Sequence, residues 1–327
     1  MPYQKIFDPE LPAALPPPAP PDAQPRSGDR RDGQVYVYED EIVLGVNIAL
    51  ATGRPLLLYG PPGSGKSSLA AHVARCLGWR YHPSVITSRT QARDLLYHFD
   101  VVRRLSDAQT DEGVNENIAA YIEPGVLWWA FDRHGARRRG GAGAEPLPFK
   151  EAREPQADRQ PDRDECVVLI DEIDKADPDV PNNLLVPLGS YTFRVHELDR
   201  EIDVKSPPLL FITTNDEREL PKAFLRRCVI LTLKAPKKSR LVEIAQAHFD
   251  PPHDLELYRE VAEIVKQEEK KSKERKSPPP STAEYLDALF ACRKLGVRPG
   301  TEGWDAIFHT ILDKRAEPAP EPETEEA

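Results

Sequence analysis

Gly60-Pro-Pro-Gly-Ser-Gly-Lys66-Ser67 is the stretch that decides the fold. It matches the pattern G-x-x-x-x-G-K-[ST], in which glycines let the backbone curl so that its N–H groups face phosphate groups. The flanking sequence has the required form. Pro55–Tyr59 is an apolar run typical of a buried parallel strand, and Ser68–Leu77 has the spacing of an amphipathic helix that ends at Gly78. A strand, a glycine-rich turn and a helix together predict a phosphate-binding loop.

The residues of this loop carry groups that suit a nucleotide and its metal ion. Lys66 can reach the β- and γ-phosphates, and the hydroxyl of Ser67 can ligate Mg²⁺. ATP and Mg²⁺ are therefore the expected cofactors, although nothing in the loop decides between adenine and guanine. We expect the nucleotide to contact Gly60, Pro61, Pro62, Gly63, Ser64, Gly65, Lys66, Ser67 and Ser68.

A second motif follows about a hundred residues later, where the β-forming run Val167–Ile170 leads into Asp171 and Glu172. An Asp-Glu pair alone is a common surface feature. At the end of a buried strand, however, Asp171 can hold the Mg²⁺ shell and Glu172 can polarise an attacking water. The two motifs together predict nucleotide hydrolysis.

Two further groups follow along the chain. Asn215 ends the third apolar strand and could position the water, although Thr-Thr-Asn can also be a plain strand end and turn. Arg226 and Arg227 end a short predicted helix before the fourth strand, Val229–Leu233. They are either a basic helix end, favourable with the dipole, or an arginine finger for a neighbouring subunit's site.

Composition excludes several classes of protein. The chain has 327 residues, 34 prolines and a net charge of −10, which argues against a dominant electrostatic hold on nucleic acid. No apolar stretch approaches the ~20 residues that span a bilayer, and no signal peptide is evident. The cysteines are far apart and form no Cys-x-x-Cys pair, so a reduced, cytoplasmic location without zinc is expected; they are Cys76, Cys166, Cys228 and Cys292.

The prolines and the apolar patterns also predict the domain organisation. Apolar strands stop after Pro236 and helical patterns take over, which indicates an α/β layer followed by a small helical domain. A hairpin is expected about Glu197–Arg200, and Tyr81–Thr87 is a weaker strand candidate. The expected segments are a disordered proline-rich leader at 1–34, the α/β domain at 35–235 with a flexible insertion at about 135–165, the helical domain at 236–315 and an acidic disordered tail at 316–327.

These motifs resemble the AAA+ ATPases, and within them the MoxR-like branch, over about Tyr36–Leu295. The resemblance implies a P-loop NTPase core, an αβα parallel sheet, followed by a small all-helical lid domain. Its markers are Gly60–Ser67, Val168–Asp174, the stretch starting at Asn182, Thr213–Asn215 and Leu220–Cys228.

The resemblance also implies roles for single residues. The hairpin at Tyr191–Val204 looks like the family's pre-sensor hairpin, and Glu123–Leu127 looks like the part that faces a central pore. The implied site consists of Lys66 and Ser67 for nucleotide and Mg²⁺, Asp171 for the metal, Glu172 for water activation, Asn215 as sensor 1, and Arg227 acting in trans, with Arg226 as its alternative.

One departure from the family pattern concerns the lid. Relatives carry a sensor-2 arginine in a Ser-Thr-Arg or Ser-Pro-Arg stretch, whereas this chain has Ser281-Thr282-Ala283-Glu284. Arg293 or another lid residue is a candidate substitute. The departure puts the intrinsic rate of hydrolysis in doubt, but not nucleotide binding.

Two functions of different classes are compatible with these features. The resemblance implies an oligomeric ATPase, expected as a hexameric ring, that remodels or activates a partner protein bearing a von Willebrand factor A domain. The alternative is a nucleotide-gated binding or signalling module with slow turnover, or a GTP-specific relative. The missing sensor-2 arginine favours the second function slightly, whereas Glu172 and a candidate finger favour the first.

Overall fold

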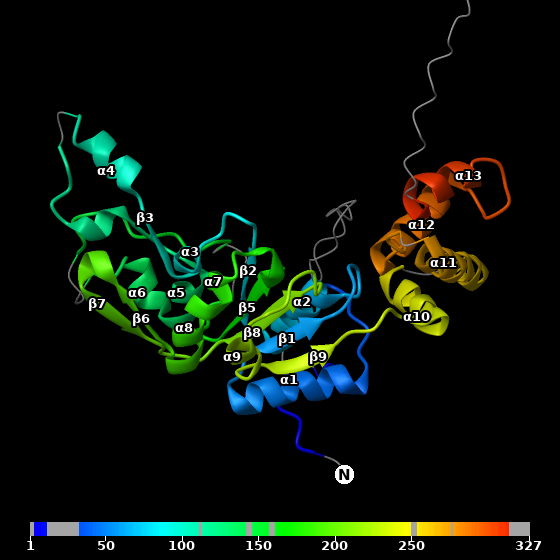
Figure 1. Ribbon diagram of the computed structural model, residues 1–327, viewed down its shortest axis with the longest axis horizontal. Coiled ribbons are helices and arrows are strands. Elements are labelled where there is room, and N and C mark those ends of the chain that lie inside the picture. The colour runs from blue at the N-terminus through cyan, green and yellow to red at the C-terminus, as the bar shows by residue number, and fades with distance from the viewer. Residues whose placement is uncertain are drawn as a thin grey trace, which may run out of the picture. The chain divides into compact units, whose positions relative to one another are not determined.

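The computed structural model describes residues 3–11, 33–110, 113–141, 146–156, 161–249, 254–275 and 277–313. The described chain divides into two compact units, one ending at Lys234 and one beginning at Ala235 (Figure 1). The expected acidic tail and most of the expected leader lie outside the described residues. Each unit has its own core.

A five-stranded sheet with the order β2-β5-β8-β1-β9 forms the centre of the first unit, and every pair of neighbours is parallel. Each of the four apolar runs predicted as strands forms one strand of this sheet, and the weaker candidate at 81–87 forms the edge strand β2. The strands are β1 (Leu56–Tyr59), β2 (Arg80–Val85), β5 (Cys166–Asp171), β8 (Leu209–Thr214) and β9 (Val229–Thr232).

Successive side chains of the central strands point to opposite faces of the sheet, and each face is covered by helices. Leu56 and Phe211 belong to the core shared with α1 (Asp40–Thr52) and α2 (Lys66–Leu77). The next residues along the same strands, such as Leu57 and Ile212, belong to the core on the other face, together with α5 (Val126–Phe131). The structure therefore confirms the predicted αβα layers of a P-loop NTPase.

The second face also carries an excursion from the sheet, visible in Figure 1 as α4 standing away from the layers. Its strands pair antiparallel, and α5 follows them with Trp128 and Trp129 fully buried, as their helical spacing predicted. Leu127 is buried as well. The elements are α3 (Ala92–Leu96), β3 (Tyr97–Phe99), α4 (Val101–Asp107), η1 (Ile118–Tyr121) and β4 (Ile122–Pro124).

The predicted hairpin is present and lies next to the elements that follow β5. Its strands β6 (Thr192–Val195) and β7 (Arg200–Asp203) pair antiparallel about the 3-10 turn η4 (His196–Leu198). The short helices of this region are η3 (Ile173–Lys175), α7 (Asp179–Asn183), α8 (Leu185–Ser190) and α9 (Lys222–Leu225).

The segment expected to be a flexible insertion, about 135–165, has described parts that pack against the α/β unit. It begins within α6 (Arg133–Arg137), and the structure buries Arg138, Arg139, Ala152 and Glu154. The segment contains no apolar run, and a charged side chain, Glu154, attaches it through ion pairs with Arg80 and Arg133.

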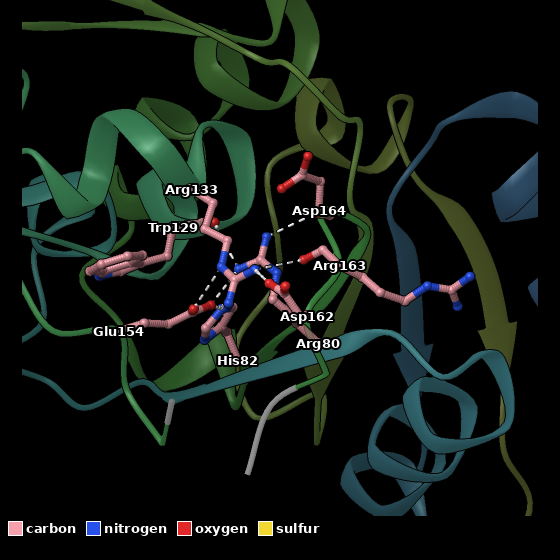
Figure 2. Close-up of polar contacts among 8 residues, drawn as sticks. All are labelled: Arg80, His82, Trp129, Arg133, Glu154, Asp162, Arg163 and Asp164. Carbon is pink, nitrogen blue, oxygen red and sulfur yellow. Dashed lines mark hydrogen bonds and ion pairs between the residues drawn. The ribbon is translucent and has the colours of Figure 1, made fainter. Parts of the chain in front are cut away.

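That attachment is a buried cluster of charged side chains at the edge strand β2 (Figure 2). Glu154 accepts hydrogen bonds from Arg80 at 2.5 Å and Arg133 at 2.9 Å, and it lies 3.1 Å from His82 Nε2. Arg80 also donates to the backbone oxygens of Trp129 and Asp164. Burial by itself would raise the pKa of Glu154, but its basic partners outweigh that effect and lower the pKa to about 2.

The leader was expected to be disordered over 1–34, but its residues 3–11 are packed against the first unit. Phe7 is only 1% exposed and belongs to the core beneath α1 and α2. A single buried aromatic ring can hold such a short segment, and composition statistics over a proline-rich stretch do not detect it.

The described part of the second unit contains helices and no strand, as the apolar spacing after Pro236 predicted. Its core is formed by side chains such as Tyr258, Val261 and Leu289. Among the described helices, none is long and apolar enough to cross a membrane. The helices are α10 (Lys238–His248), α11 (Leu255–Arg275), α12 (Thr282–Leu295), α13 (Trp304–Ile307) and η5 (Phe308–Leu312).

Replacing Glu154 tests the charged attachment. We expect Glu154→Gln to lower the free energy of unfolding by about 3–5 kcal/mol, because it leaves Arg80 buried without its anionic partner. Because the pKa of folded Glu154 is depressed, its stabilisation is present above the ordinary value of 4.5 and is lost as the pH falls towards about 2. The difference between wild type and variant in urea unfolding should therefore shrink below pH 4.5.

The matched control for this prediction is Asp162→Asn. Asp162 pairs with Arg133 at 2.9 Å, but its side chain is fully exposed, so its loss should cost less than about 1 kcal/mol. Equal costs for the two variants would show that the buried cluster does not hold the segment.

Candidate functional site

The predicted phosphate loop lies between the end of β1 and the start of α2. Gly60 has φ 150°, and a Cβ there would come 2.4 Å from the carbonyl oxygen of Leu233. Gly65 has φ 88°, and a Cβ there would come 3.2 Å from the ring of Tyr36. Glycine is required at both positions, because any side chain would meet a neighbour in a strained backbone conformation.

Lys66 is drawn into the interior at the start of α2 and is 7% exposed. Its ammonium donates to the backbone oxygens of Gly60 at 2.6 Å and Pro61 at 3.0 Å, and to Asn215 Oδ1 at 2.8 Å. Burial lowers the pKa of Lys66, and the nearby carboxylates, Asp171 first among them, oppose that shift. The predicted loop lysine and the predicted sensor asparagine are thus in direct contact.

Ser67 and Asp171, the two predicted metal ligands, are also in contact. The Ser67 hydroxyl lies 2.9 Å from both carboxylate oxygens of Asp171, which is 1% exposed. Thr213 on the neighbouring strand donates to Asp171 Oδ1 at 2.5 Å and accepts the backbone N–H of Glu172 at 2.8 Å. The Thr213 hydroxyl therefore fixes both the carboxylate of Asp171 and the backbone N–H of Glu172.

Glu172 follows the strand in a left-handed conformation, with φ 62° and ψ 48°. Its side chain is 25% exposed and forms an ion pair with Lys175 at 2.7 Å. The hydrogen bond from that ammonium to Glu172 raises the pKa of Lys175. The carboxylate predicted to activate water is thus at the surface of the site and has a basic partner.

Asp174 links this turn to the loop after β8. It is 3% exposed, and one of its carboxylate oxygens accepts the backbone N–H groups of Asn215 and Glu217, both at 3.0 Å. A carboxylate that receives two backbone donors holds them firmly. Asp174 therefore sets the position from which Asn215 reaches Lys66.

The register of the sheet explains why residues so far apart in the sequence meet here. Leu58 of β1 is opposite Thr213 of β8, and Ile170 of β5 is opposite Ile212 of β8. Because parallel strands end at the same edge, the residues just beyond them are neighbours. One edge of the sheet thus brings together Lys66, Ser67, Asp171 and Asn215.

Arg226 and Arg227 are not part of this group. Both follow α9 and are exposed, and Arg227 Nη1 donates to the backbone oxygen of Ala223 at 3.4 Å. The Arg227 side chain also lies close to Gly189 of α8. In the described part of the chain neither guanidinium has an acidic partner, so both are available to another molecule.

Several features of the loop fit a nucleotide with Mg²⁺. Ser64 Oγ is buried and has no hydrogen-bond partner among the described residues, and it lies in the loop that curls around Lys66. Ser68 follows Ser67 in the first turn of α2 and is half-buried. No group of three or more His, Cys, Asp or Glu side chains gathers as a metal site in the described ranges, but Mg²⁺ commonly takes one or two carboxylates and completes its shell with phosphates and waters.

In the helical unit, the stretch that corresponds to the family's sensor 2 has a structural role. Ser281 is the N-cap of α12, and its backbone N–H donates to Glu284 at 2.5 Å while the Ser281 hydroxyl accepts the N–H of Glu284 at 3.4 Å. Arg293, the candidate substitute, is in the last turn of α12 with its guanidinium 5.0 Å from the ring centre of Phe249.

Thr213 and Asp174 were missed as site residues by the sequence analysis. Both lay inside stretches that were recognised, so their positions were known but not their contacts. The signal for Thr213 was its place beside the end of β5, and the signal for Asp174 was its spacing of three residues from Asp171, one 3-10 turn.

Comparison with known proteins gives distant matches. The chain is 30% identical over 215 residues to Lon protease of Salinispora arenicola, and 24% identical over 273 residues to the mitochondrial Lon protease homolog of Yarrowia lipolytica. These matches cover 64% and 80% of this chain but only 22% and 18% of the relatives. A RuvB variant of Thermotoga maritima is 16% identical, with a TM-score of 0.40 over 83% of this chain and 66% of that one.

A family model matches the part of the chain that contains the candidate site. It describes an AAA domain of the dynein-related subfamily and matches residues 55–228, the span from the start of β1 to the end of α9 and Cys228. That span is more than half of the chain and includes the phosphate loop, the Asp-Glu pair and Asn215. The chain therefore belongs to the AAA domain family, dynein-related subfamily.

Proposed function

We propose that this protein binds ATP with Mg²⁺ and hydrolyses it to ADP and phosphate. The observation that carries the proposal is the contact of Lys66 with Asn215 at 2.8 Å, next to the contact of Ser67 with Asp171 at 2.9 Å. A buried ammonium, a hydroxyl and a carboxylate lie together at the edge of a parallel sheet, beside a glycine-rich loop. Membership in the AAA domain family supports ATP-dependent activity in general.

Each residue of the site has a task in this proposal. Lys66 exchanges the neutral carbonyls of Gly60 and Pro61 for phosphate oxygens, which are stronger acceptors because they are charged. Ser67 and Asp171 would hold Mg²⁺, which would supply positive charge beside the phosphates. Glu172 accepts a proton from the attacking water, and Asn215 orients that water.

The proposal extends to an assembly that acts on a partner protein. Arg227 is exposed and without an acidic partner among the described residues, as an arginine that completes a neighbouring subunit's site must be. Arg226 is next to it and is the alternative. We propose a ring, hexameric by resemblance to the MoxR-like branch, that remodels or activates a protein bearing a von Willebrand factor A domain.

A nucleotide-gated module with slow turnover is the second candidate, and two observations favour it. The carboxylate of Glu172 is held by Lys175 at 2.7 Å, which opposes its use as a base. The lid position where relatives carry an arginine is occupied by Ala283, and the next residue, Glu284, takes part in the cap of α12. The choice between the two candidates depends on the rate of hydrolysis and on its dependence on assembly.

Two substitutions should separate nucleotide binding from hydrolysis. We expect Lys66→Ala to weaken ADP–Mg²⁺ binding at least about tenfold, because a charged donor to the phosphates is lost. Glu172→Gln should bind ATP normally but hydrolyse it about 10²–10⁴ times more slowly, because the general base is lost. Titration calorimetry measures the first effect and phosphate release the second; Lys234→Ala, an exposed lysine, is the control.

The arginine finger can be tested by mixing two inactive variants. Arg227→Ala should lower hydrolysis by about 10³-fold without changing nucleotide affinity, since Arg227 acts on the transition state of a neighbouring subunit. Mixing Arg227→Ala with Glu172→Gln should restore part of the activity, because intact fingers then meet intact sites. Specific activity of the wild type should rise with protein concentration. The control is Lys222→Ala, an exposed basic residue of α9; unchanged activity of Arg227→Ala would mean that Arg226 is the finger or that neither arginine is.

Asp174 provides a test of how Asn215 is positioned. We expect Asp174→Ala to slow hydrolysis about tenfold or more and to lower the free energy of unfolding by about 1–3 kcal/mol, since two buried backbone N–H groups lose their acceptor. Glu219→Ala, an exposed acid of the same loop, should change neither quantity. Normal hydrolysis by Asp174→Ala would mean that Asn215 does not depend on this contact.

A further inference from the structure

Residues 3–11 contact α1 through one buried side chain and one asparagine. Phe7 is 1% exposed and Asn47 of α1 is 4% exposed. Asn47 Oδ1 accepts the backbone N–H groups of Ile6 at 2.6 Å and Phe7 at 2.9 Å, and Asn47 Nδ2 donates to the Phe7 carbonyl at 2.8 Å. Three hydrogen bonds to one side chain fix the backbone of this segment at the point where its ring enters the core.

The ring of Phe7 is the first of three aromatic rings in contact. Its centre lies 5.6 Å from that of Tyr38, which in turn lies 4.9 Å from that of Tyr36 in an edge-to-face arrangement. The Tyr38 hydroxyl is 2.8 Å from Nδ1 of His72 in α2. The three rings therefore connect the N-terminal segment to the helix that follows the phosphate loop.

The last ring of the series lies against the phosphate loop itself. Tyr36 is the neighbour that a Cβ on Gly65 would meet at 3.2 Å, and Gly65 is the residue immediately before Lys66. The backbone at Gly33 rests directly on α2, since a Cβ there would come 2.6 Å from the carbonyl carbon of Ala71. The segment 33–38 therefore packs against both the phosphate loop and α2.

The contact works by packing rather than by charge. Burial lowers the pKa of His72 to about 4, so its ring is neutral at physiological pH, and burial raises the pKa of Tyr38. Neutral rings in edge-to-face contact contribute mainly through buried apolar area and shape. Removal of one ring would therefore loosen its neighbours without changing the charge at the site.

We propose that residues 3–11 position the phosphate loop for nucleotide, with Phe7 as the positioning residue and Tyr38 and Tyr36 as the link. The inference rests on the proposed function, because it concerns the nucleotide that the loop would bind. The loop needs such support, since Gly60, Gly63 and Gly65 all have positive φ and glycine restricts the backbone least. A loop that is ordered before binding has less conformational freedom to lose when phosphate arrives.

Titration calorimetry of the full chain with ADP–Mg²⁺ tests the proposal. We expect Phe7→Ala to raise the Kd about fivefold or more, the lower range of a typical coupling between sites, with the binding stoichiometry unchanged. Phe7→Leu, which keeps a large apolar side chain in the core, should restore most of the affinity. Ile6→Ala is the matched control, since Ile6 is the adjacent residue and is 59% exposed.

The same titration distinguishes positioning from simple loss of folded protein. A purely structural role would lower the stoichiometry and leave the Kd of the remaining folded molecules unchanged, and that result would overturn the proposal. Combining Phe7→Ala with Tyr36→Ala adds a second criterion: the two effects on Kd should not be additive, because both act through one contact. Additive effects would contradict the link.

Failure of the inference and failure of the proposed function give different results. If the wild type binds ADP–Mg²⁺ and Phe7→Ala binds it equally well, the positioning role is wrong and the proposed function stands. If the wild type shows no binding while its circular dichroism spectrum indicates a folded chain, both are wrong.

Discussion

The candidate site depends on one geometric constraint, which is that β1, β8 and β5 are neighbours and parallel. Their carboxyl ends lie at one edge of the sheet, so the residues that follow these strands are neighbours in space. Lys66 meets Asn215 across β1 and β8, and Asp171 meets Thr213 across β8 and β5. Because the strands carry apolar residues on both faces, both helical layers hold this edge in place.

Charge balance imposes the second constraint on this edge. The ammonium of Lys66 is almost fully buried, which costs free energy unless acceptors and negative charge are close. Two backbone oxygens and Asn215 supply the acceptors, while Asp171, Asp174 and Glu172 supply the negative charge that works against the loss of its proton. A phosphate chain would enter a site that already has one cation fixed in place.

The sequence predicts those parts of the fold that depend on continuous apolar runs. The four buried strands, the helices around them and the helical second unit follow from periodicity, and the site follows from residues placed directly after those strands. Thr213 and Asp174 could be located but not assigned, because their roles are hydrogen bonds to backbone groups of other loops. Periodicity carries no information on such contacts.

The leader and the insertion were predicted to be unstructured for a different reason, which is that the prediction rested on average composition. Glu154 and Phe7 each sit in a stretch whose composition is that of unstructured chain, yet each is buried. Glu154 is held by two arginines and a histidine from distant elements, and Phe7 by Asn47 and by the core that its ring enters. One residue of this kind attaches the described part of its segment, but the average composition of the segment does not reveal it.

The residues proposed to bind nucleotide and Mg²⁺ are held more firmly than Glu172, the residue proposed to activate water, and this difference bears on the rate of turnover. Lys66 and Ser67 are in α2 and Asp171 is in β5; Ser67 is hydrogen-bonded to Asp171, and Lys66 to Asn215. Glu172 is one residue further on, in a left-handed turn, with a partly exposed carboxylate that an exposed lysine holds by an ion pair. Such a pair is worth about 1 kcal/mol or less and is readily broken. In the proposed chemistry, nucleotide binding would therefore depend on residues fixed at the edge of the sheet, whereas hydrolysis would depend on a carboxylate whose ion pair with Lys175 must first break.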